Sequence, residues 1–313
     1  EELELIASMR PGMIQLEIGV QSTNPEVVRE IRRKMDFDRV ARVVRRLSEN
    51  HNVHLHLDLI AGLPLEDFAS FGRSFDQVYA LRPQQLQLGF LKVLKGAYMY
   101  EKAADYGCVY RQKEPYEVLF TRWISFEEIL RLKQTEEMVE VYYNSGQFAR
   151  TLEEAEKYFS SPFAFYDSLG AFCDRKGYLE ISHTRVRRYE ILEEFLENAL
   201  KERQDQEAIL ETVREKMVLD LYSRENLKSR PQWAGSLEDC RGRIREFYRR
   251  EAQTHRYLPE YEDYDEKQLM RMTHLERTGA FGGERFWLFD YRKRDPITRE
   301  AACTDVTEAV REL

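Results

Sequence analysis

Three extended, apolar-rich segments, separated by stretches long enough to form helices, most constrain how this chain can fold. The extended segments are Ile14–Val20, Val53–Ile60 and Gln85–Val93, and apolar residues recur at helical spacing in Phe37–Ser48 and Glu66–Leu81 between them. Strands that alternate with amphipathic helices in this way are typical of βαβ units, in which neighbouring strands run parallel. The N-terminal third of the chain therefore predicts an α/β structure built on three parallel strands.

Each of these segments has one apolar face and a second face of polar or small residues, because side chains alternate along a strand. The second face carries Gln15, Glu17, Gly19, Gln21, His54, His56, Asp58, Ile60, Gln85, Gln87 and Gly89. A parallel sheet covered by helices on both faces would show continuous apolar runs instead. The pattern favours a barrel, or an incomplete barrel, whose inner wall faces a ligand cavity. An antiparallel sheet with one solvated face shows the same alternation, but the helix-length connections disfavour it.

The rest of the chain is predicted to be mostly helical. Ser125 and Glu128 have the spacing of a capping box at the start of a helix that ends near Asn144. Near the C-terminus, a turn at Asp295-Pro296 between two short strands indicates a β-hairpin, and a further turn is expected at residues 279–283. The other expected helices and the two hairpin strands are Leu152–Phe159, Pro162–Lys176, Arg185–Glu202, Asp205–Tyr222, Leu237–Glu251, Arg285–Tyr291 and Ala301–Val306.

Composition limits the classes of protein and partner. The formal net charge of −8 argues against a general nucleic-acid partner, and the sequence has no apolar run long enough for a transmembrane helix and no signal peptide. The four cysteines lie far apart, which excludes a local zinc or iron–sulfur loop of the usual spacings. We therefore expect a cytoplasmic protein with reduced thiols, no membrane association and no metal site of its own.

Gln21 and Asp58 are the strongest candidates for ligand binding. Each lies near the C-terminal end of its predicted strand, on the polar face. Ligands of α/β barrels bind at that end of the sheet, and an amide and a carboxylate there can bond to the adjacent hydroxyls of a ribose. Gly62 and Pro64, which follow the second strand, would let the backbone approach an adenine and then turn into the next helix.

Two segments together resemble a known family. The pair "EIGVQS" and "DLIAGLP", at residues 17–22 and 58–64, is followed after a helix by "LQLGFLKVLKG". This arrangement resembles the second half of the TIM-barrel-like fold of radical S-adenosylmethionine (SAM) enzymes, in the coproporphyrinogen-dehydrogenase and Elp-type branch. Through "PYEVL", "LKQTEEMVEVYYNSGQF" and "SPFAFYDSL", the chain is similar to cobalamin-binding-type radical SAM proteins with a C-terminal domain of unknown function.

The resemblance implies a fold, a domain division and roles for site residues. Residues 1–112 would form the C-terminal half of a partial (β/α)6 barrel with three parallel strands. Residues 113–313 would form a mostly α-helical accessory domain with a terminal β-hairpin. Gln21 and Asp58 would bond to the SAM ribose, while Ile60 and the backbone near Leu91 would contact the adenine. Glu17 would help to keep the site polar or face the substrate; a carboxylate paired within the barrel wall is the alternative reading.

The family's defining feature is missing from this sequence. No CxxxCxxC loop is present to hold the [4Fe–4S] cluster that cleaves SAM, so the cluster ligands, like any cobalamin domain, would lie outside this chain. The chain opens with Glu1-Glu2 rather than Met, and we expect it to be a fragment, inactive without its N-terminal half. The resemblance also implies a reductant such as flavodoxin or ferredoxin as a partner. Catalytic residues and substrate remain unknown.

Two alternatives stay open at this stage. The chain could be a non-catalytic binding or scaffold module with a remnant half-barrel, or a SAM- or nucleotide-binding barrel enzyme without a cluster. His54 and His56 lie two residues apart on one strand and could be two metal ligands. Because no third ligand is evident, we interpret them as polar residues of the inner wall.

Overall fold

The structure, a computed structural model, describes residues 1–279 and 283–313, so the turn expected at 279–283 lies partly outside the described residues. The chain divides into two compact units. Unit 1 comprises Glu1–Gly146 and Glu156–Ile181, and unit 2 comprises Gln147–Ala155 and Ser182–Leu313. The predicted domain division at residue 112 concerns sequence domains and stays a prediction, because packing alone defines these units.

Unit 1 is built on a parallel sheet with the strand order β1-β2-β3. Its strands are β1 (Ile14–Gln21), β2 (Val53–Ala61) and β3 (Gln85–Phe90). The mixed α/β fold with three parallel strands is thus confirmed, and the antiparallel alternative is wrong. The third strand is shorter than predicted because the chain leaves the sheet after Phe90, and Lys92 then forms an antiparallel bridge with Glu117.

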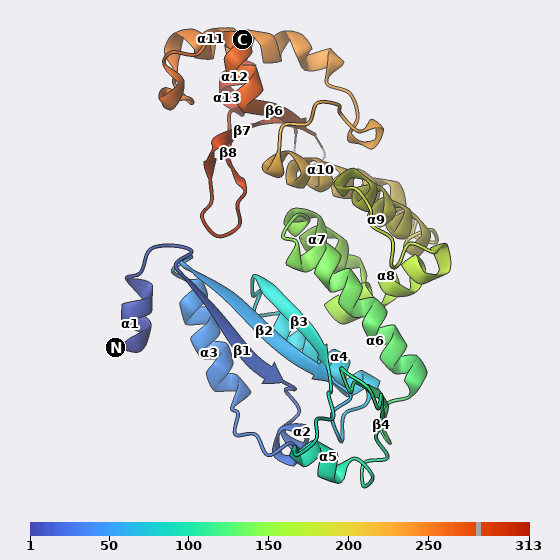
Figure 1. The fold of residues 1–313 in the computed structure, drawn as a ribbon. Helices are drawn as coiled ribbons and strands as arrows, with labels where there is room; N and C mark the ends of the chain where they lie inside the picture. Colours follow the sequence, from blue (N-terminus) through green and yellow to red (C-terminus); the bar gives the residue numbers. More distant parts are fainter. Residues whose placement is uncertain (280–282) are drawn as a thin grey trace. The chain divides into compact units, whose positions relative to one another are not determined.

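Helices α3 (Phe37–Ser48) and α4 (Phe68–Tyr79) connect the strands and cover the apolar face of the sheet (Figure 1). Asp36 and Asp67 cap them, each accepting a hydrogen bond from a backbone N–H three residues on, as N-cap carboxylates do. The leucines of β2 that face these helices are fully buried. Burial of this face against α3 and α4 leaves the opposite face of the sheet for the polar residues.

The remaining elements of unit 1 are mostly helical. The capping box of Ser125 and Glu128 is present and begins α6, which packs against α8. At Gly170 of α8, a Cβ would lie 3.1 Å from the backbone of Gln134, so the small residue permits this close approach. The elements are α1 (Glu2–Ala7), α2 (Pro25–Glu30), α5 (Tyr98–Lys102), β4 (Val109–Tyr110), β5 (Val118–Phe120), α6 (Phe126–Met138), η1 (Val139–Asn144), η2 (Glu156–Tyr158) and α8 (Pro162–Lys176).

The π-helix η1 closes the edge of the sheet at β3. The side-chain amide of Asn144 accepts a hydrogen bond from Leu86 N–H (2.9 Å) and donates one to Leu86 C=O (3.0 Å), as a neighbouring strand would. The hydroxyl of Tyr143 donates to the carbonyl of Pro83. These contacts protect backbone groups that an edge strand would otherwise expose. The sequence predicted that the helix stops near Asn144, but not that its last turn binds the sheet.

A buried polar cluster ties α8 and η2 to α4 within unit 1. The hydroxyls of Tyr79 and Tyr166 lie 2.9 Å apart, and both donate to the carboxylate of Glu156. Arg82 pairs with the other oxygen of Glu156 at 3.2 Å. Because these buried groups bond to one another, the segment that carries Glu156 belongs with the sheet rather than with the helices that precede it in sequence.

Unit 2 combines helices with a three-stranded antiparallel sheet of order β6-β7-β8. The hairpin of β7 (Arg285–Arg294) and β8 (Ala301–Asp305) is confirmed, while β6 (Thr273–Thr278) was not predicted. Buried apolar residues of β6 and β7 (Leu275, Phe286 and Leu288) pack in one core with helices α11, α12 and α13. The helices are α7 (Ala149–Ala155), α9 (Arg185–Ala199), α10 (Gln206–Arg224), η3 (Gln232–Ala234), η4 (Glu238–Cys240), α11 (Arg241–Thr254), η5 (Pro259–Tyr261), α12 (Glu266–Met272) and α13 (Thr307–Arg311).

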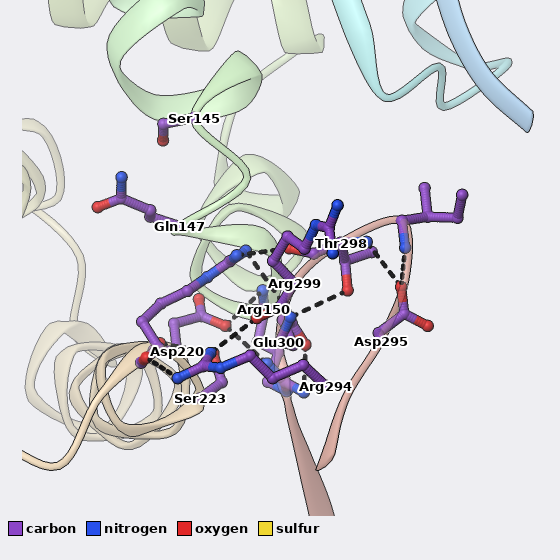
Figure 2. Close-up of polar contacts among 12 residues, drawn as sticks. Ser145, Gln147, Arg150, Asp220, Ser223, Arg294, Asp295, Thr298, Arg299 and Glu300 are labelled. Carbon is purple, nitrogen blue, oxygen red and sulfur yellow. Dashed lines mark hydrogen bonds and ion pairs between the residues drawn. The ribbon is translucent and has the colours of Figure 1, made fainter. Parts of the chain in front are cut away.

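Asp220 joins three parts of unit 2 (Figure 2). Its carboxylate, 1% exposed, accepts hydrogen bonds from the backbone N–H groups of Arg150 and Thr151, from the Thr151 hydroxyl and from the Arg150 guanidinium. The same guanidinium pairs with Glu300, the last residue of the turn between β7 and β8, 3.1 Å away. This network explains why residues 147–155 belong to unit 2 although the flanking residues belong to unit 1.

Within the described residues, no helix is both long enough and apolar enough to cross a bilayer.

Candidate functional site

Four of the five predicted site residues line one pocket of unit 1. Gln21, Asp58, Ile60 and Leu91 surround a pocket of about 330 Å³ at the C-terminal ends of the three parallel strands. The other residues that line the pocket are Leu59, Gln87, Gly89, Phe90 and Lys92. The pocket thus lies at the end of the sheet where ligands of parallel α/β folds bind.

A β-bulge directs Gln21 into this pocket. The pairing of β1 with β2 shifts between Gly19, which lies opposite Asp58, and Gln21, which lies opposite Leu59. Gln21 itself has a φ of 70°. Its side chain lies over Gly19, where a Cβ would come within 2.5 Å of the Gln21 amide nitrogen. A side chain at Gly19 would displace the Gln21 amide from this position, and bulges commonly redirect side chains in this way.

Asp58 lies at the centre of the polar face. Its neighbours in register are Gly19 on β1 and Gln87 on β3. Partial burial raises the pKa of Asp58, and the Glu17 carboxylate acts in the same direction, whereas His56 and Arg33 lower it. The Asp58 side chain is 28% exposed and lines the pocket, so a ligand hydroxyl can reach the carboxylate from there.

Glu17 lies outside the pocket. It is exposed on β1, opposite His56, and accepts a hydrogen bond from the Gln15 amide at 3.4 Å. His54 lies two residues before His56 on the same face of β2, and partial burial lowers its pKa. These residues form a polar wall beneath the pocket, as the alternation predicted. Glu17 does not line the pocket and acts on it only through the electrostatic effect of its carboxylate on Asp58.

The backbone of Leu91 is already bonded to the protein. Its N–H donates to the Ala61 carbonyl (2.9 Å) and its C=O accepts from Val118 N–H (2.8 Å). We predicted backbone contacts from this region to an adenine. These two bonds leave Leu91 chiefly as an apolar wall, together with Ile60. At Gly62, φ is +83° and a Cβ would lie 2.7 Å from Val118, so only glycine fits this turn.

A buried carboxylate beside the pocket was not predicted. Glu66, 1% exposed, accepts hydrogen bonds from Ser22 Oγ (2.6 Å) and Ser74 Oγ (3.2 Å). Burial raises the pKa of Glu66 to about 7, although the serine hydroxyls oppose the shift. Ser22 directly follows Gln21, so this contact fixes the end of β1 to α4. A glutamate four residues after Gly62 is too common a feature to reveal such a partner from sequence.

Metal-binding residues do not cluster in the described part of the chain. It contains no group of three or more His, Cys, Asp or Glu side chains that could hold an ion. Cys108, Cys173, Cys240 and Cys303 are free thiols.

Three cavities that are larger than this pocket, of about 740, 510 and 390 Å³, contain charged side chains but none of the predicted site residues. The cavity of about 740 Å³ lies beside Ile18, on the helix-covered side of β1, and its polar lining is mostly basic: Arg29, Arg33, Lys34 and Arg39, with Asp36. Another, of about 510 Å³ in unit 2, is lined in part by Arg230 and Arg277. These arginines are paired with Glu276 and Asp239 respectively. We therefore take the smaller pocket as the candidate site, because an amide, a carboxylate and apolar walls meet there.

Comparison with known proteins assigns the chain to a family. No curated protein matches it. Residues 104–280 match the model of a family described as "Protein of unknown function (DUF4080)". The match begins after β3, so it contains most of the helical part of the chain and none of the pocket residues. Because it spans more than half of the 313 residues, the chain belongs to this family of uncharacterised proteins.

Proposed function

We propose that this chain is part of a radical SAM enzyme and that its pocket binds the nucleoside of SAM. The main support is the convergence of Gln21 and Asp58, which come from two strands, in one pocket with Ile60. The resemblance of residues 17–22 and 58–64 to that superfamily adds support from sequence. The pocket volume of about 330 Å³ lies at the low end of ligand sites, which suits a nucleoside better than a large substrate.

Each pocket residue has a distinct role in the proposal. The Asp58 carboxylate accepts a hydrogen bond from one ribose hydroxyl. The Gln21 amide, which can both donate and accept, bonds to the adjacent hydroxyl. Ile60 and Leu91 provide apolar contacts for the adenine, and the turn at Gly62 brings the backbone close. Glu17 contributes negative charge from the wall without touching the nucleoside.

The described residues can hold one of the proposed cofactors, SAM, but not the iron–sulfur cluster. The pocket suits SAM, but the four separate thiols do not fit an iron–sulfur cluster within the described residues. In the proposal, a [4Fe–4S] cluster, reduced by a flavodoxin or ferredoxin, is held by residues outside this chain and supplies the electron that cleaves SAM. A cobalamin domain would likewise lie elsewhere.

The free edge of β1 supports an N-terminal half-barrel as partner. Among the described strands, β1 pairs only with β2. A preceding strand could bond to its other edge and extend the curved sheet, as closure of a barrel requires. The proposal also includes a cytoplasmic location, which the four free thiols support.

Binding of SAM to the full-length protein tests the assignment. Asp58→Ala and Gln21→Ala should each weaken affinity at least about fivefold, since each removes a hydrogen bond worth on the order of 1 kcal/mol or more. Gln15→Ala is a matched control, because this exposed glutamine lies on the same strand and face but outside the pocket. Isothermal titration calorimetry would measure the change, and unchanged affinity in both pocket variants would refute the assignment.

Reductive cleavage of SAM distinguishes an enzyme from a scaffold. Anaerobic release of 5′-deoxyadenosine by the reduced full-length protein would favour the enzyme. SAM binding without cleavage, in a protein whose complete sequence has no CxxxCxxC loop, would favour a non-catalytic module with a remnant barrel.

A further inference from the structure

His56 is a buried imidazole without a hydrogen bond. Its side chain is 9% exposed, and neither ring nitrogen has a hydrogen-bond partner among the described residues. Burying polar atoms without partners costs free energy comparable to that of a lost hydrogen bond, so native structures rarely retain them without a reason. The orientation of His56 is therefore a feature that the fold alone does not explain.

The atom nearest to forming such a bond belongs to Asp58. His56 Nε2 lies 3.1 Å from Asp58 Oδ1, within bonding distance, but the two groups are not aligned as a hydrogen bond. Asp58 Oδ1 is itself buried without a partner in the described part of the chain. The side chain of Asp58 is nevertheless 28% exposed and lines the pocket. One carboxylate oxygen thus faces His56, and the other remains available to a ligand.

We propose that His56 is a positioning residue, whose Nε2–H holds Asp58 Oδ1 while a ligand hydroxyl donates to Oδ2. This inference rests on the proposed function, because it assumes that Asp58 binds the nucleoside. A rotation of the carboxylate toward the ligand would align the bond to His56, so that His56 Nε2 and Asp58 Oδ1, two of the three unpartnered atoms, would each gain a partner. Catalytic hydrogen bonds that are poorly aligned without ligand commonly tighten on binding.

Charged neighbours decide how Asp58 binds at different pH values. Glu17 from β1, His56 from β2, Arg33 from the segment after α2 and Lys92 at the pocket mouth are the charged or titratable groups around it. Burial raises the pKa of Asp58, and the opposing effect of His56 only partly offsets this rise. Ligand affinity should therefore rise as pH increases through this pKa, because only the ionised carboxylate leaves both oxygens as acceptors.

The test measures SAM affinity of the full-length protein by calorimetry between pH 5 and pH 8. His56→Leu should weaken binding about five- to tenfold at pH 7, as expected for a bond to a charged group. It should also move the acid limb of the affinity profile to higher pH, because Asp58 loses a neighbour that lowers its pKa. His56→Gln retains a terminal N–H donor and should bind within about twofold of wild type.

His54→Gln is the matched control, because it changes the neighbouring histidine on the same face and lies outside the pocket. It should leave the affinity and the pH profile unchanged. If His56→Leu does not fold, a folded His56→Gln variant with more than fivefold weaker binding overturns the inference. Unchanged affinity and profile in His56→Leu also overturn it. A wild-type protein that binds no SAM refutes the proposed function itself, which separates the two failures.

Discussion

Glu66 should make the stability of unit 1 depend on pH in a way that a single substitution removes. The carboxylate is almost fully buried and is bonded through one oxygen to Ser22 and Ser74. Its second oxygen is buried without a partner among the described residues. Burial therefore disfavours the ionised form, and the pKa of Glu66 rises from 4.5 to about 7.

The magnitude follows from the two pKa values. Because the folded-state pKa lies above the unfolded value, the folded state is favoured when Glu66 is protonated. This contribution is complete below pH 4.5 and is lost as pH rises through about 7. The full difference corresponds to roughly 3 kcal/mol. Between pH 5 and pH 8, wild type should lose about 2 to 3 kcal/mol of stability from this group alone.

Glu66→Gln isolates the effect, because the amide imitates the neutral acid and does not titrate. Urea unfolding at pH 5, 6, 7 and 8 measures the free energy of unfolding of both proteins. The value for the variant relative to wild type should increase by about 2 to 3 kcal/mol between pH 5 and pH 8. Trp123 is the tryptophan of unit 1, so replacing Trp233 and Trp287 by Phe in both proteins lets fluorescence report this unit. Other titrating groups cancel in the difference. A difference that stays constant with pH would refute the reasoning.

Two further predictions concern structural contacts. Asp220→Ala should destabilise unit 2 by about 3 to 5 kcal/mol in urea unfolding, because it leaves buried donors unpaired. The control Asp205→Ala, which removes an exposed carboxylate paired with Arg203, should cost less than about 1 kcal/mol. Equal losses of stability in the two variants would contradict the prediction. Asn144→Ala should cost about 1 to 3 kcal/mol and speed amide exchange at Leu86, whereas Asn50→Ala should not; unchanged exchange at Leu86 would disprove the edge contact.

Sequence patterns were sufficient where the determinants are local. The alternation along β2 predicted which side chains face the helices, and the capping box at Ser125 predicted the start of α6. Gln21 and Asp58 could be placed together because the C-terminal ends of neighbouring parallel strands lie at one edge of the sheet. These inferences need only backbone periodicity and strand order.

Sequence patterns were insufficient where distant residues set the geometry. The bulge at Gln21 depends on how β1 pairs with β2, which periodicity does not encode. The bond between Ser22 and Glu66 joins residues 44 positions apart, and no spacing rule links them. Strand β6 was missed because its residues, including charged Glu276, lack a clear apolar alternation. Glu276 is buried because Arg230, His274 and the backbone N–H of Arg277 all bond to its carboxylate.

The contact between η1 and β3 ties helix length to sheet position. In a π-helix the backbone hydrogen bonds span five residues rather than the four of an α-helix, so each π-turn contains one extra residue. The π-turn at Val139–Asn144 therefore accommodates one extra residue while α6 keeps its packing against α8 and Asn144 still reaches Leu86. Adding or removing a residue within α6 would instead rotate Asn144 by about 100° around the helix axis and turn it away from Leu86. Evolutionary insertions and deletions should consequently be tolerated less well in α6 than within this π-turn.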